Sequence, residues 1–146
     1  MIYQTSKGLH PDLKKYGCYF LSILRIYEKE AKLELEVTTV NQIYELCQKV
    51  QYVGHDAYIL EGGISGIAQI ASAVTTAGVY MRLMDNQGNY NNIIGKFSRK
   101  LPSGLHNSHF VLMENANDVD YDPWPNSKTV REGQIVDYRY VHSEVV

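Results

Sequence analysis

The sequence has few cysteines, no long apolar run and no cluster of positive charge. Its two cysteines, Cys18 and Cys47, are too few for a disulfide framework among 146 residues, which indicates a reducing compartment. The net charge is −2 and no Lys/Arg run exceeds two residues, which argues against a nucleic-acid-binding surface. No segment approaches the roughly 18 consecutive apolar residues of a membrane span, so no membrane partner is expected.

The N-terminal segment "MIYQTSKGLHPDLKK" has no apolar core of signal-peptide length. We therefore expect a cytoplasmic protein, with delivery inside a phage particle or by another route without a signal left open. Hydrophobic residues make up 45% and charged residues 21% of the chain, an ordinary balance for a globular protein. The length predicts one domain over residues 1–146. The oligomeric state stays open.

Hydrophobic periodicity predicts helices in the first half of the chain and strands in the second. Residues 1–16 are polar and are predicted as an ordered arm or loops. The predicted helices cover residues 17–32, about ten residues opened by the capping box Thr39-Val-Asn-Gln42, and a small-residue segment capped by Ser65 and stopped by Gly78. The predicted strands cover residues 79–84, 93–97, 109–114, the segment "VDYD" and residues 133–141. Helices followed by an antiparallel sheet indicate an α+β fold.

Cys18 follows Gly17 at the head of the first predicted helix. A helix N-terminus carries partial positive charge and unpaired N–H groups, which favour a thiolate and can hold an oxyanion. Gly17 would allow a sharp turn and a close approach of substrate to the backbone. The alternative interpretation is a buried small hydrophobic residue. Cys47 illustrates that case, because it lies mid-helix on an apolar stripe and is assigned to the core.

His109 and Asp122 lie on one predicted hairpin. If the turn centres on residues 115–116, His109 faces Asp122 directly across the strands; a four-residue loop makes them diagonal neighbours on the same face. A loop with an odd number of residues would separate them unless a bulge corrected the register. We expect His109 Nδ1–H to donate to the Asp122 carboxylate, which would fix the ring tautomer. Cys18, His109 and Asp122 would then form a nucleophile, a base and an orienting group.

These residues also carry a resemblance to a known family. The pattern "Q…YGC…S", then "HFVLM" and a hairpin ending in "DP", resembles the papain-like cysteine peptidases, and most closely the branch of bacteriocin-processing, double-glycine-cleaving peptidases. The resemblance implies a papain-like fold, hydrolysis of a peptide or cell-wall cross-link without a cofactor, and Gln4 as the oxyanion-binding amide. Gln4 lies fourteen residues before Cys18. The chain also resembles small uncharacterised bacterial proteins linked to phages and plasmids.

Other interpretations of these residues remain open. The fold could serve as a non-catalytic binding or structural module, because the bulky Tyr19 and Phe20 follow the cysteine where relatives have small residues. A thiol acyltransferase would use the same site residues as a hydrolase. His106 and His109 have His-x-x-His spacing, but no zinc motif accompanies them and no metal site is expected. Trp124 is interpreted as a loop anchor against the sheet in preference to a binding surface.

Overall fold

The computed structural model describes all residues from 1 to 146 and has an α+β fold. Helices occupy the N-terminal half: α1 (Pro11–Tyr16), α2 (Cys18–Ala31), α3 (Val37–Lys49), the 3-10 turn η1 (His55–Ala57) and α4 (Gly63–Thr75). The C-terminal half contains β1 (Val79–Met84), β2 (Asn92–Lys100), β3 (His106–Met113), β4 (Val119–Tyr121), α5 (Lys128–Glu132) and β5 (Gln134–Val145). None of the helices has the length and apolar character needed to span a membrane.

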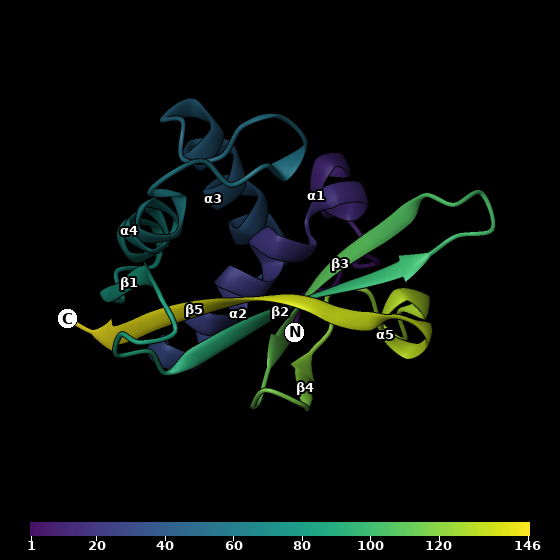
Figure 1. The fold of residues 1–146 in the computed structure, drawn as a ribbon. Coiled ribbons are helices and arrows are strands. Elements are labelled where there is room, and N and C mark those ends of the chain that lie inside the picture. Colours follow the sequence, from purple (N-terminus) through teal and green to yellow (C-terminus); the bar gives the residue numbers. More distant parts are fainter.

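The strands form one antiparallel sheet in the order β1-β5-β2-β3-β4. Helices α1 to α4 lie on one side of this sheet, while the short α5 lies near the ends of β2 and β5 (Figure 1). The main core of 25 buried residues fills the space between the helices and the sheet, and includes Ile94 and Leu112. Side chains that alternate with these along β2 and β3, such as Phe97 and Val111, form a smaller cluster with Val130 of α5.

The helices differ from the sequence expectation mainly at their N-termini. Helix α3 begins at Val37, before the predicted capping box at Thr39, and no side chain caps it. Helix α4 begins at Gly63, because Gly62 adopts the left-handed conformation (φ 74°) that starts the turn. The predicted cap, Ser65, instead donates from Oγ to the backbone oxygen of Met81 at 2.7 Å.

The expectation that residues 1–16 form only an arm or loops is wrong for its last six residues. Pro11 occupies the first turn of α1, where its missing N–H costs no hydrogen bond, and the His10 ring accepts a hydrogen bond from Asp12 N. The sheet also extends beyond the predicted strands. Polar pairs such as Ser98–Ser108 and Arg99–Asn107 lengthen the β2–β3 hairpin, and an apolar pattern cannot indicate such pairs.

Candidate functional site

Gly17 joins α1 to α2 and places Cys18 as the first residue of α2. The sequence suggested that Gly17 allows a sharp turn. Its φ of −85° is accessible to any residue, so the turn does not require a glycine. The glycine is needed for close packing, because a Cβ at this position would lie 2.5 Å from the backbone oxygen of Leu13. The Gly17 N–H donates to the same oxygen at 3.0 Å. This contact holds α1 against the start of α2 and fixes where Cys18 emerges.

The β3–β4 hairpin brings His109 and Asp122 to one face through a bulge. Met113 pairs with Val119, which leaves a loop of residues 114–118, an odd number. The register shifts at the next pair, Leu112 with Tyr121, and Asp120 is the additional residue. With the shifted register, Asp122 follows as the diagonal neighbour of His109 on the same face of the sheet. Of the loop geometries weighed from the sequence, the odd loop with a correcting bulge is the one present.

The bulged residue also ties the hairpin to the helix that carries the cysteine. Asp120 forms an ion pair with Lys29 of α2, while Tyr121 packs in the main core. The hairpin and α2 are therefore fixed relative to each other by an ion pair and by apolar packing. This fixes the position of His109 relative to the start of α2.

A short hydrogen bond of 2.6 Å joins His109 Nε2 to Asp122 Oδ1. The expectation of a bond through Nδ1 is wrong. Because Asp122 is the diagonal neighbour of His109, its carboxylate meets Nε2, the ring nitrogen farther from the backbone. Asp122 Oδ1 also accepts from the Trp124 backbone N–H at 3.0 Å, and Oδ2 accepts from the Ser127 N–H at 3.4 Å. The carboxylate thus orients the imidazole and shapes the loop that follows β4.

His109 is buried, with 7% of its surface exposed. Burial alone would lower the pKa of the imidazole, because it disfavours the charged ring. The hydrogen bond with Asp122, the interaction with the Cys18 thiol and the charges of both partners outweigh burial and raise the pKa of His109 to about 9. The ring is therefore mostly an imidazolium at neutral pH. Cys18 and Asp122 are the two side chains that cause this.

Cys18 is partly exposed and lies where two cavities meet. The larger one, here called the long cleft, has a volume of about 860 Å³ and runs between the helices and the sheet. The smaller one, here called the small pocket, has a volume of about 250 Å³ and is lined by Gln4, Cys18 and His109 among others. Cys47 is fully buried, as the sequence predicted, and burial raises the pKa of its thiol to about 12.

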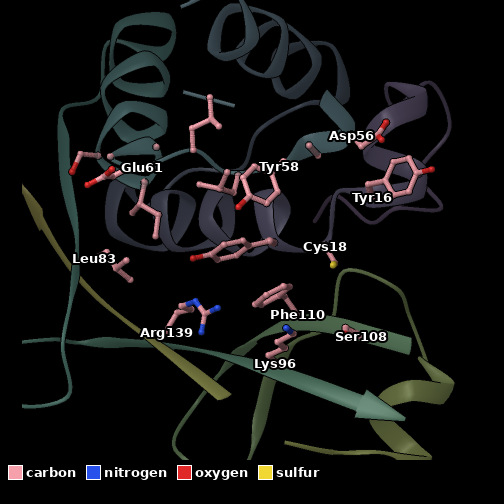
Figure 2. A pocket seen from close by; sticks show the side chains of 18 of the residues that line it. Tyr16, Cys18, Asp56, Tyr58, Glu61, Leu83, Lys96, Ser108, Phe110 and Arg139 are labelled. Atoms are coloured by element: carbon pink, nitrogen blue, oxygen red, sulfur yellow. The ribbon is translucent and has the colours of Figure 1, made fainter. Parts of the chain in front are cut away.

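Figure 2 shows the long cleft, with Cys18 at one end and Phe110, Lys96 and Arg139 along the sheet side. The two bulky residues that follow Cys18, Tyr19 and Phe20, lie in different environments. Phe20 is fully buried in the core, whereas Tyr19 lines the cleft and stacks on Phe110 with ring centroids 4.4 Å apart. Tyr19 therefore forms part of the cleft wall instead of filling the space beside Cys18.

Gln4 lies in the small pocket beside the cysteine and the histidine. Its backbone N–H donates to the Pro123 oxygen at 2.8 Å, which ties the N-terminal arm to the residues after Asp122. Its side-chain Nε2 donates to the backbone oxygens of Leu13 and Lys14, each at 3.3 Å. The side-chain Oε1 is buried and has no hydrogen-bond partner. The structure thus brings Gln4 to the site through contacts that its sequence position does not indicate.

Three further features of the site differ from the sequence interpretation or were missed by it. Trp124 is 46% exposed and lines the small pocket, so it does not anchor the loop against the sheet. Helix α5, which carries no long apolar pattern, contributes Lys128 and Thr129 to the same pocket. His106 lines neither cavity and shares a hydrogen bond with Ser98, so the His-x-x-His spacing does not bring its two rings to one site.

Comparison with known proteins identifies a family. A family model described as "Protein of unknown function, DUF261" matches residues 1–143. No curated protein and no solved structure matches the chain. Because the family model covers nearly all of the sequence, from the arm with Gln4 to the end of the sheet, this protein belongs to the DUF261 family.

Proposed function

We propose that the protein is a papain-like thiol hydrolase, a cysteine peptidase or amidase, that cleaves an amide bond of a peptide or cell-wall peptide. One observation carries the proposal: Cys18 and His109 line the same pocket, where Asp122 holds the His109 ring by a hydrogen bond of 2.6 Å. The same two neighbours, Cys18 and Asp122, raise the pKa of His109 to about 9, which favours the charged ring. A charged imidazole next to a sulfur favours the thiolate, which is the form that attacks a carbonyl. Cys18 and His109 are the proposed catalytic residues, and Asp122 is the positioning residue.

The reaction uses these groups in two stages. The Cys18 thiolate attacks the amide carbon, a C–S bond forms, and the carbonyl oxygen becomes an oxyanion. The C–N bond then breaks as the His109 imidazolium gives its proton to the leaving amine. In the second stage the neutral imidazole takes a proton from water, the resulting hydroxide attacks the thioester, and the C–S bond breaks. The carboxylic acid leaves and the thiolate with its imidazolium is restored.

The oxyanion is formed next to Gln4. The Gln4 Nε2 carries two hydrogens and makes two long hydrogen bonds of 3.3 Å to backbone oxygens, so it can turn one N–H toward a ligand at little cost. An amide donor placed at an oxyanion stabilises the developing charge by about 3 kcal/mol. Gln4 is the proposed oxyanion donor, together with the backbone at the start of α2.

Labelling with iodoacetamide tests the proposal without knowledge of the substrate. At pH 7 we expect Cys18 to be alkylated at least about tenfold faster than Cys47, and His109→Ala to slow Cys18 by about tenfold, as measured by mass spectrometry of each cysteine peptide. Equal and slow rates for both cysteines, or a Cys18 rate that His109→Ala leaves unchanged, would contradict the hydrolase. A non-catalytic module that keeps the fold and the cleft would then be the better account.

A further inference from the structure

The two cavities that meet at Cys18 differ in size and in their relation to His109. Both contain Cys18, Lys15, Asn107 and Ser108, but His109 lines only the small pocket. Ligand pockets for drug-sized molecules hold roughly 300–1,000 Å³. The long cleft, at about 860 Å³, lies near the top of that range, and the small pocket, at about 250 Å³, lies below it. The long cleft has room for an extended chain, whereas the small pocket has room for one or two residues.

The chemistry of the proposed hydrolase assigns a part of the substrate to each cavity. The amine that leaves must face the imidazolium that protonates it, and the acyl part must extend away on the other side of the sulfur. Because His109 faces the small pocket alone, the leaving group lies there. The acyl part then occupies the long cleft, along Tyr19 and Phe110.

The small pocket is strongly cationic. Its lining includes Lys15, Arg99 and Lys128, and no acidic side chain lines it. Two acidic residues that do not line the pocket pair with residues that do: Asp122 binds His109, and a Glu132 carboxylate oxygen lies 3.6 Å from an Arg99 nitrogen. Lys15 and Lys128 make no ion pair, and the buried Nε of Arg99 has no hydrogen-bond partner. The pocket therefore holds two ammonium groups, those of Lys15 and Lys128, that no acidic side chain neutralises.

We propose that the small pocket binds a carboxylate on the leaving group, so that the enzyme removes one or two residues with a free carboxyl end from a longer chain. The inference rests on the proposed function. Guanidinium and ammonium groups are the usual partners of a carboxylate, and Arg99, Lys15 and Lys128 bring three of them to this pocket. Asn107, Ser127 and Thr129 add neutral donors around the same space.

Two alkylating reagents of nearly the same size test this charge preference. Iodoacetate carries a carboxylate and iodoacetamide a neutral amide, and both transfer their carbon to the sulfur with loss of iodide. At pH 7 and about 0.1 M ionic strength we expect Cys18 of the full chain to react faster with iodoacetate than with iodoacetamide. Lys15→Gln combined with Lys128→Gln should lower the ratio of the two rates by about tenfold. Lys14→Gln, a charge change in the same helix but outside both cavities, should leave the ratio unchanged.

The outcomes separate the two proposals. If Cys18 reacts rapidly with iodoacetamide but more slowly with iodoacetate, or if the two lysine substitutions leave the ratio unchanged, the carboxylate pocket is overturned and the hydrolase stands. If Cys18 reacts with iodoacetamide as slowly as Cys47, the hydrolase is overturned and the pocket assignment goes with it. Arg99→Gln removes the third cation of the lining and, followed with the same two reagents, should likewise lower the ratio of the two rates.

Discussion

His109 Nε2 and Asp122 Oδ1 lie 2.6 Å apart only because one residue, Asp120, bulges from the hairpin between them. Without the extra residue, the loop of residues 114–118 would turn the two side chains to opposite faces of the sheet. The bulge thus places the imidazole of His109 and the carboxylate of Asp122 on the same face of the sheet. Bulges next to active sites commonly re-aim a side chain in this way.

The raised pKa of His109 makes the stability of the fold depend on pH. A group whose pKa is higher in the folded than in the unfolded chain stabilises the fold below the unfolded value, here 6.5, and this contribution is lost as the pH rises through about 9. The difference corresponds to about 3 kcal/mol in the free energy of unfolding. Urea denaturation of the native chain and of His109→Gln should therefore show the advantage of the native chain shrinking between pH 6 and pH 10. A constant difference across this range would contradict the assignment.

Asp122→Asn separates the charge of the carboxylate from its role in the loop. The asparagine Oδ1 can still accept from the Trp124 N–H, whereas Nδ2 cannot accept from the Ser127 N–H, and the side chain no longer supplies the charge that raises the pKa of His109. We expect alkylation of Cys18 at pH 7 to slow by about tenfold, with a loss of stability of about 1–2 kcal/mol.

Asp122→Ala is the matched control for that substitution. It removes both the charge and the hydrogen bonds to the loop, so we expect the same slowing of Cys18 alkylation with a larger loss of stability, by about 1 kcal/mol or more. If Asp122→Asn leaves the alkylation rate at the native value, the carboxylate has no part in positioning the ring.

Gly17→Ala tests the packing that places Cys18. The added Cβ would lie 2.5 Å from the Leu13 oxygen and 2.7 Å from its Cα, both of them backbone atoms that cannot move aside cheaply. We expect a loss of about 1–3 kcal/mol in the free energy of unfolding and slower alkylation of Cys18. Gly54→Ala is the control, because a Cβ there meets only ordinary contacts of 3.7 Å or more. Equal stability of the two variants would show that the Gly17 contact is not tight.

The sequence supports the helix-then-sheet order, which follows from periodicity. The face shared by His109 and Asp122 was one of several possibilities that the sequence left open, because it depends on the bulge at Asp120. The ring nitrogen that meets Asp122 could not be predicted, because it depends on a bulge that adds one residue without changing the alternation visible in "VDYD". The close contact between Gly17 and Leu13 could not be predicted either. A glycine required for tight packing cannot be distinguished in the sequence from a glycine required for a turn.

The small pocket could not be predicted from the sequence. Its walls come from the N-terminal arm, α1, the start of α2, β2, β3 and the segment from Trp124 to Thr129, most of which are far apart in the chain. Gln4 reaches the site through a backbone bond to Pro123, and Lys128 does so on a helix of only five residues. No local pattern signals either position, since each depends on how the loop after Asp122 is held.

The coupling between Cys18 and His109 can be measured directly by following the His109 ring protons by NMR as a function of pH. The ring should titrate with a pKa of about 9 in the native chain and in Cys47→Ala. In Cys18→Ala it should titrate at a clearly lower pH, because the thiol and its charge contribute to the raised pKa. A ring that titrates near 6.5 in the native chain, or at the same pH with and without Cys18, would contradict a poised thiol–imidazole pair and the hydrolase built on it.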